Sequence, residues 1–239
     1  TSLIGHEGIV FVTDFGYAEG VGYYFVMEYL PGGTLDFHMA NNPPMDVARV
    51  VRFALTISSA LAAVHELGIV HCDLKPSNLI LTQQRNGSEI VKILDFGVSS
   101  HVTANQEGIF GTPYYMSPEQ TLSMKVTDRA DQFSLAVILY EMLTGHRPWE
   151  IERWEDATPW MRERHPPKPP SFYMKDGSDE LDGVILRALE VDPVRRWQDI
   201  QSFAWGLAMA SEVEWSALPD PWDSAGSSNA PHRRPTSLS

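Results

Sequence analysis

Polar and charged residues suited to one kind of chemistry lie in two short runs of the chain. His71 to Asn78 reads HCDLKPSN, and Ile93 to Gly97 reads ILDFG. Transfer of a phosphoryl group needs an aligned hydroxyl, bound metal ions and neutralisation of the charge that develops on the phosphate. An aspartate that orients the hydroxyl, a lysine and two oxygen ligands for Mg²⁺ meet these needs, and the two runs contain all four.

Each of the four residues has an expected role. Asp73 would orient the acceptor hydroxyl and take its proton, and Lys75 would place a cation near the γ-phosphate of ATP. Asn78 and Asp95 would bind the magnesium ions that bridge the phosphates. Alone, each aspartate or the asparagine could be a turn residue that bonds to nearby backbone. Their combination in neighbouring runs favours the catalytic interpretation.

Short strands are expected to hold these runs in place. Leu79 to Thr82 and Ile90 to Leu94 flank a polar Asn-Gly turn, so the charged residues should lie on loops beside a small sheet. Ile9 to Ala18 and Tyr23 to Tyr29 are rich in Val, Ile, Phe and Tyr and are separated by glycines. This pattern predicts a second β-hairpin.

Helices are expected to form most of the remaining chain. Asp46 to Leu67 carries apolar residues on one face and is followed by Gly68, a pattern that predicts a long helix with a glycine end. Thr127 to Leu143 is apolar nearly all round and is expected at the centre of the helical region. Further helices are expected within Glu150 to Arg164, from Asp179 to Glu190 and from Gln198 to Ala210.

Composition limits the partners and the compartment. The chain has 31 acidic and 18 basic residues and a formal net charge of −13, so nucleic acid is not an expected partner, nor is an anionic membrane surface. The single cysteine excludes an internal disulfide. Phe133 to Leu143 is too short an apolar run to cross a bilayer. We therefore expect a cytoplasmic protein, or the cytoplasmic part of a longer one, and no pattern indicates an oligomeric state.

Two further motifs follow the charged runs. Gly111 to Glu119 reads GTPYYMSPE, and Asp192 to Arg196 reads DPVRR. With these motifs in this order, the chain from Ile4 to Ala210 resembles the eukaryotic-like, Hanks-type Ser/Thr protein kinases, in particular the bacterial ones. The resemblance implies an α+β, protein-kinase-like fold with a mainly α-helical C-lobe and a remnant of the N-lobe β-sheet.

The resemblance also implies a division of the chain. Residues 1–29 would be the N-lobe remnant, with the end of the helix C region and two strands, and residues 30–210 would be the C-lobe. Residues 211–239 are rich in Ser, Pro, Asp and Gly and are expected to be a disordered tail.

An ATP site is implied at the junction of the two lobes. Met27 would be the gatekeeper, and Glu28 to Leu30 would form the hinge whose backbone pairs with adenine. Ile80 would lie beneath the adenine ring. The implied cofactors are ATP and Mg²⁺.

The resemblance assigns an acceptor class and two structural roles. Lys75 and Thr112, the latter in the substrate-docking run, favour a Ser or Thr acceptor on a protein substrate over Tyr. Glu119 would form a buried salt bridge with Arg196, and Asp131 would anchor the catalytic-loop backbone.

Two motif residues, one near the catalytic Asp73 and one next to the metal-binding Asp95, are expected to be structural. His71 is interpreted as a packed core histidine rather than a general base, and Phe96 as a packing residue. Cys72 replaces the arginine that usually precedes the catalytic aspartate, and we interpret it as an inert thiol. A thiol cannot bind a phosphorylated activation loop as arginine does, so such phosphorylation is not expected to be the switch.

The sequence lacks other parts that the family uses. It contains no Gly-rich loop opening a strand hairpin and no assignable strand lysine to hold the α- and β-phosphates. We therefore expect this chain alone to be nearly inactive and to be a fragment of a longer kinase. The alternative is a pseudokinase-like protein-interaction module without phosphotransfer. A small-molecule kinase is disfavoured, because the run ending at Glu119 serves peptide acceptors.

Overall fold

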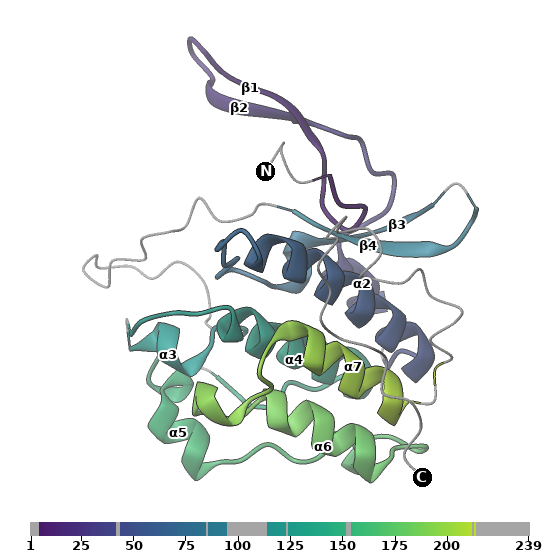
Figure 1. The fold of residues 1–239 in the computed structure, drawn as a ribbon, viewed down its shortest axis with the longest axis vertical. Helices are drawn as coiled ribbons and strands as arrows, with labels where there is room; N and C mark the ends of the chain where they lie inside the picture. Colours follow the sequence, from purple (N-terminus) through teal and green to yellow (C-terminus); the bar gives the residue numbers. More distant parts are fainter. Residues whose placement is uncertain are drawn as a thin grey trace.

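A long β-hairpin stands on one side of a helical body, and a second hairpin lies at their junction (Figure 1). This computed structural model describes residues 5–41, 44–84, 86–94, 114–122, 124–151, 154–211 and 213. Asp95, Phe96 and Thr112 therefore lie outside the described residues, as does the predicted tail from residue 214 onward.

The described elements are two pairs of short strands and α-helices of four to nineteen residues. The strands are β1 (Val12–Ala18), β2 (Gly22–Met27), β3 (Leu79–Gln83) and β4 (Glu89–Ile93). The α-helices are α1 (Leu35–Asn41), α2 (Val47–His65), α3 (Pro118–Thr121), α4 (Arg129–Thr144), α5 (Pro159–Arg164), α6 (Asp179–Ala188) and α7 (Ile200–Ala210). Single 3₁₀ turns occur at Pro76–Asn78, Trp154–Ala157, Pro170–Phe172 and Pro193–Arg195.

Strands β1 and β2 form the antiparallel hairpin that the sequence predicts, with shifted ends. A register shift between Val12 and Asp14 marks a bulge at the start of β1. Ile9, expected within β1, instead forms an isolated parallel bridge with Ile93 of β4. The glycine-rich connection supplies the positive φ that the turn needs, at Gly20 (82°) and Gly22 (98°).

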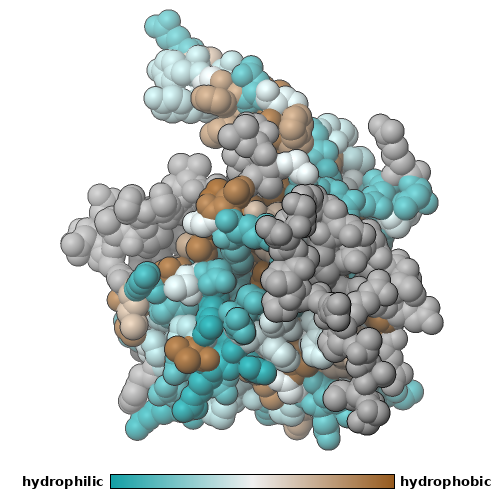
Figure 2. Space-filling view, viewed as in Figure 1, coloured by the Kyte–Doolittle hydropathy of each residue, from teal (hydrophilic) through white to brown (hydrophobic). Residues whose placement is uncertain are grey.

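The β1–β2 hairpin leaves much of its apolar surface uncovered. Phe15 is 75% exposed and Tyr23 is 85% exposed, and apolar side chains gather on this hairpin in the space-filling view (Figure 2). A two-stranded sheet without a covering layer buries too little surface to be stable by itself. The core of the described residues therefore lies in the helical body.

Helices α2 and α4 form the centre of that core. Asp46 caps α2 by accepting a hydrogen bond from the Arg49 N–H, and Gly68 follows its end with φ of 72°. The apolar side of α2 packs on α4, α7 and β4, and α4 is buried nearly all round. By length and composition α2 would fit a membrane span, but most of it is buried inside the protein.

Strands β3 and β4 attach the loop from His71 to Asn78, the predicted catalytic loop, to this core. They pair in antiparallel register through a turn at Gly87, whose φ is 85°. Leu79 and Leu81 point into the core, whereas Ile80 between them lies on the other face of the sheet. The loop that precedes β3 is thereby held at one end by a buried strand.

Candidate active site

The loop from His71 to Asn78 brings three of the four predicted catalytic and metal-binding residues together. Lys75 Nζ lies 2.8 Å from Asp73 Oδ2, and Asn78 Nδ2 lies 3.2 Å from the same oxygen. No described residue hydrogen-bonds to the other carboxylate oxygen, Oδ1, and the side chain is 46% exposed. Asp73 thus has one carboxylate oxygen without a partner among the described residues, while Lys75 and Asn78 hold the second.

The side-chain amide of Asn78 is oriented with its nitrogen toward Asp73. Nδ2 also donates to the Asp73 carbonyl oxygen at 2.9 Å, which leaves the amide oxygen Oδ1 without a partner among the described residues. The Asn78 backbone carbonyl accepts from the Leu94 N–H at 2.8 Å. The end of β4, after which Asp95 follows in the chain, is therefore fixed beside Asn78.

His71 supports the loop from beneath. The side chain is fully buried, and its Nδ1 accepts the Asp73 N–H at 3.2 Å. Because Nδ1 is the acceptor, the ring proton lies on Nε2, which is 3.1 Å from the Leu94 carbonyl oxygen. Both ring nitrogens are thus used in holding backbone, an arrangement suited to support rather than proton transfer.

Asp131, at the start of α4, fixes the backbone just before Asp73. Its two carboxylate oxygens accept the N–H groups of His71 at 2.8 Å and Cys72 at 2.9 Å. Oδ2 is also 2.8 Å from His65 Nε2. Among the described residues, Cys72 is the only one other than glycine with a positive φ, at 64°. Asp131 therefore stabilises a backbone conformation that side chains disfavour.

The Cys72 thiol is held in its neutral form. Partial burial, with further contributions from the charges of Asp131 and Asp73, raises its pKa to about 11. A thiolate is the form that reacts with oxidants and electrophiles. The environment of Cys72 therefore disfavours a redox role near neutral pH.

The predicted hinge is tied to the small sheet by an ion pair. Glu28 Oε1 accepts from Lys92 Nζ at 2.6 Å and from the Phe11 N–H at 2.9 Å. Partial desolvation opposes ionisation of Glu28, but these hydrogen bonds outweigh it and lower the pKa of the carboxyl. Lys92 is directly opposite Ile80 in the β3–β4 register, so both side chains lie on the sheet face beside the hinge.

The chain that follows the predicted hinge places its backbone close to strand β3. Met27 ends β2 and is 41% exposed, and Leu30 is half-buried. The Gly33 carbonyl accepts from the Leu81 N–H at 3.0 Å. A Cβ on Gly32 would lie 1.5 Å from the Leu81 carbonyl oxygen, so only glycine allows this approach.

A buried ion pair fixes the end of the predicted docking run. Arg196 makes a bidentate pair with Glu119, with both N–O distances 2.8 Å. Its guanidinium also donates to the backbone carbonyls of Arg129, Glu190 and Val191. Because every donor is used, burial of this charge is compensated.

A second buried arginine lies next to this pair. Arg162 of α5 donates to the Met116 carbonyl at 2.9 Å, and its guanidinium lies over the rings of Phe133 and Trp149. Its Nε and Nη2 have no hydrogen-bond partner among the described residues. Desolvation, followed by repulsion from Arg196, lowers its pKa to about 9, so the side chain stays charged at neutral pH. No sequence motif singles out Arg162.

The exposed side of the docking run carries a polar cluster that the sequence also did not reveal. Tyr115 Oη donates to Glu141 at 2.6 Å, and Arg147 donates to the same carboxylate at 3.1 Å. The Arg147 guanidinium lies 3.6 Å from the centre of the Tyr114 ring. Aromatic and charged groups thus hold the docking run against the end of α4.

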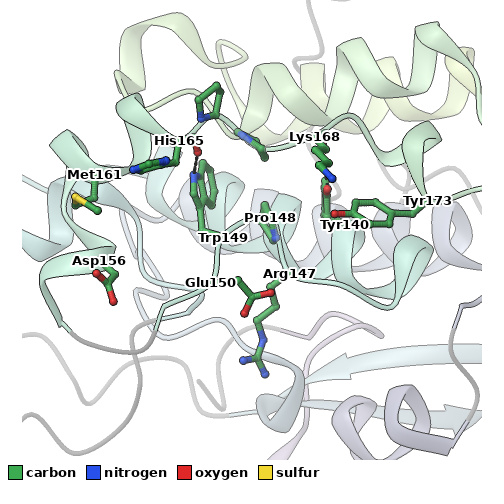
Figure 3. A pocket seen from close by; sticks show the side chains of 12 residues that line it. Tyr140, Arg147, Pro148, Trp149, Glu150, Asp156, Met161, His165, Lys168 and Tyr173 are labelled. Carbon is green, nitrogen blue, oxygen red and sulfur yellow. Dashed lines mark hydrogen bonds between the residues drawn. The ribbon is translucent and has the colours of Figure 1, made fainter.

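Arg147 also lines a cavity of about 340 Å³ in the helical body (Figure 3). Trp149 lies at the cavity wall and donates to the His165 carbonyl oxygen at 2.8 Å. Tyr140 on the other side donates to the Lys168 carbonyl oxygen at 2.9 Å. None of the lining residues comes from the loop His71 to Asn78 or from the predicted hinge, so this cavity is separate from the predicted ATP site.

Comparisons with known proteins identify the family of this chain. The family model described as "Protein kinase domain" matches residues 1–205. The chain belongs to this family. Among its curated relatives, Serine/threonine-protein kinase Pkn1 of Myxococcus xanthus is 39% identical over 223 residues, which cover 90% of this chain. Serine/threonine-protein kinase PknB of Mycolicibacterium smegmatis is 36% identical over 206 residues, or 82% of this chain.

Solved structures show the same fold. A crystal structure of the Rad53 kinase domain and SCD2 in complex with AMPPNP superimposes on this chain with a TM-score of 0.66 at 25% identity. That alignment covers 90% of this chain and 75% of the Rad53 chain. The matched regions cover 32% of the length of both Pkn1 and PknB. The predicted α+β, protein-kinase-like fold class is confirmed.

Proposed function

We propose that this protein kinase domain transfers the γ-phosphoryl group of ATP to Ser or Thr hydroxyls of protein substrates. The observation that carries the proposal is the arrangement of Asp73, Lys75 and Asn78, in which one aspartate oxygen is held and the other is free. The free oxygen would receive the proton of the acceptor hydroxyl. Lys75 would offset the charge that develops on the transferred group.

The residues present fit magnesium as the metal. The Asn78 amide oxygen is unpartnered among the described residues, and carboxamide and carboxylate oxygens are the hard ligands that Mg²⁺ accepts. Asp95, which follows the Leu94 anchored on Asn78, is the proposed second protein ligand. Bound magnesium would neutralise phosphate charge, and the protein supplies the oxygens that hold it.

The adenine of ATP is proposed to bind at the hinge. Backbone groups from Glu28 to Leu30, with Met27 at the entrance and Ile80 beneath the ring, would form this part of the site. The Lys92–Glu28 ion pair supports the position of the hinge backbone above the β3–β4 sheet. We place the activity in the cytoplasm, where ATP and magnesium are available.

Substrate docking is assigned to the run that ends at Glu119. Thr112 is proposed to contact the acceptor peptide near Asp73 and Lys75, and the buried Glu119–Arg196 pair would hold the run in place. Because the sequence contains no Gly-rich loop and no assignable strand lysine, we expect very low activity from the 239-residue polypeptide alone. Each missing donor of this kind typically costs about 10²–10³ in rate.

The test uses the full-length product of the gene and radiolabelled ATP with magnesium. Asp73→Asn should lower label transfer to a Ser-containing peptide by about 10²–10⁴-fold, because it removes the proton acceptor. Asp176→Asn, on an exposed loop away from the site, is the matched control and should keep full activity. Equal labelling by wild type and Asp73→Asn would contradict the mechanism. No labelling by the wild type would favour the pseudokinase-like interaction module.

A further inference from the structure

The peptide unit that leads into Asp73 is held at both ends. This unit joins the Cys72 carbonyl to the Asp73 N–H, and its atoms lie in one plane. The Asp73 N–H donates to His71 Nδ1 at 3.2 Å. The Cys72 carbonyl oxygen accepts a hydrogen bond of 2.7 Å from Gln120 Nε2. Gln120 belongs to α3, 48 residues further along the chain.

The amide of Gln120 can make these contacts in only one orientation. Its Oε1 accepts from both the N–H and the hydroxyl of Ser117, each at 2.9 Å. A backbone N–H can only donate and a carbonyl can only accept, so the oxygen must face Ser117 and the NH₂ must face Cys72. The side chain therefore bridges the end of the docking run and the catalytic loop.

We propose that Gln120 is a positioning residue for phosphoryl transfer, which fixes the peptide before Asp73 in the orientation that aims the carboxylate at the acceptor hydroxyl. The inference rests on the proposed function of Asp73. Asp131 holds the N–H groups of His71 and Cys72, but it makes no hydrogen bond to the Cys72 carbonyl. Gln120 supplies that contact, at the residue whose φ of 64° makes the backbone prone to relax.

The same contact couples peptide docking to catalysis. Gln120 follows directly after Glu119, which is locked by Arg196, so α3 is a rigid platform for the bridge. A shift of the docking run relative to α4 would move the Gln120 amide and hence the peptide that orients Asp73. Misplacement of a catalytic group lowers the rate of the chemical step more than it lowers ground-state binding.

The Gln120→Glu substitution removes one of the two contacts of the bridge and keeps the other. A carboxylate keeps the acceptor for the Ser117 N–H, as in the usual capping box of a helix start, but cannot donate to the Cys72 carbonyl. We expect kcat of the full-length protein to fall about tenfold or more, with KM for ATP and the thermal midpoint nearly unchanged. Thr121→Val removes a neighbouring hydroxyl bond to the Pro118 carbonyl within α3 and should leave kcat unchanged.

Acid should partly restore the Gln120→Glu variant. Protonation of the introduced carboxylate gives an O–H that can donate to the Cys72 carbonyl, whose partial negative charge favours the protonated form. The ratio of kcat for Gln120→Glu to kcat for the wild type should therefore rise as pH is lowered. A merely structural role would not produce this rise.

Failure of the positioning role of Gln120 can be distinguished from failure of the proposed function itself. If Asp73→Asn is inactive in the same assay and Gln120→Glu has wild-type kcat, the positioning role is wrong and the proposed function stands. If Asp73→Asn keeps wild-type activity, the proposed function of Asp73 is wrong, and the positioning role of Gln120 is wrong with it. A kcat loss in Gln120→Glu that tracks a lowered thermal midpoint, with a ratio independent of pH, would also overturn the inference.

Discussion

At the scale of single residues, the position of Asp73 depends mainly on backbone that other side chains hold. A non-glycine residue with positive φ, such as Cys72, costs about 1–3 kcal/mol. Hydrogen bonds to a charged acceptor contribute about 1.5–3 kcal/mol each, and Asp131 makes two to this turn. The buried carboxylate therefore outweighs the strain, and the loop keeps its conformation without substrate.

Substitutions at Cys72 should report this strain directly. Cys72→Gly relieves it and should leave the free energy of unfolding unchanged or raise it by up to about 1 kcal/mol. Cys72→Val places a β-branched side chain at φ of 64° and should lower that free energy by about 1–3 kcal/mol. Urea denaturation of both variants measures whether the glycine variant is the more stable of the two. Equal destabilisation by glycine and valine would show that side-chain packing, rather than backbone strain, decides stability at this position.

At the scale of elements, periodic sequence patterns predicted the long helices, because the signals that start, face and end a helix are local in the sequence. The expected helix from Asp46 to Leu67 is α2, because a capping aspartate, an apolar face and a closing glycine are local signals. Helix α3 was missed because four residues are too short for periodicity to register. A Ser at position 117 followed by Gln three residues later is a helix-start pattern that could have revealed it.

Contacts between distant segments could not be predicted from such patterns. The Lys92–Glu28 pair, the Gln120 bridge and the hydrogen bond from Arg162 to the Met116 carbonyl join residues at least 46 positions apart in the chain. No local signal encodes which carbonyl a buried side chain will meet. Asp73, Lys75 and Asn78, by contrast, could be predicted as a group because they lie within one loop, whose short spacing brings them together.

The segment that follows the hinge offers a prediction at this scale. Gly32→Ala would place a methyl group against the backbone of Leu81, which cannot move without disturbing β3. We expect a loss of about 1–3 kcal/mol in the free energy of unfolding, because overpacking forces backbone shifts. Gly183→Ala in α6 is the matched control, since beyond its chain neighbours and the local backbone of the helix no described atom lies within 4 Å of its new methyl group. It should stabilise the protein by about 0.5–1 kcal/mol. If denaturation curves gave the same free energy of unfolding for Gly32→Ala and the wild type, the close approach of Gly32 to the Leu81 backbone would be refuted.

At the scale of the whole molecule, stability and exposed apolar surface are separated in space. The buried residues of the helical body form one continuous core around α2 and α4, whereas the β1–β2 hairpin contributes mainly exposed aromatic side chains. A net charge of −13 on each molecule opposes the approach of two copies of the chain at long range. Short-range contact between hairpins is favourable nevertheless, because strand edges and aromatic faces are both available there.

Self-association of the 239-residue polypeptide should therefore run through the hairpin. Phe15 and Phe25 are directly opposite each other in the β1–β2 register and are 75% and 58% exposed. Replacing both by threonine keeps strand propensity while removing aromatic surface, so light scattering at a given concentration should fall. Phe37→Thr on α1 removes an aromatic ring that is 61% exposed and should change scattering little. If that control lowered scattering as much as the hairpin pair, general hydrophobicity and not the hairpin edge would be the cause. A fall confined to the hairpin variant would identify β1–β2 as the surface that another layer must cover for the lobe to be stable.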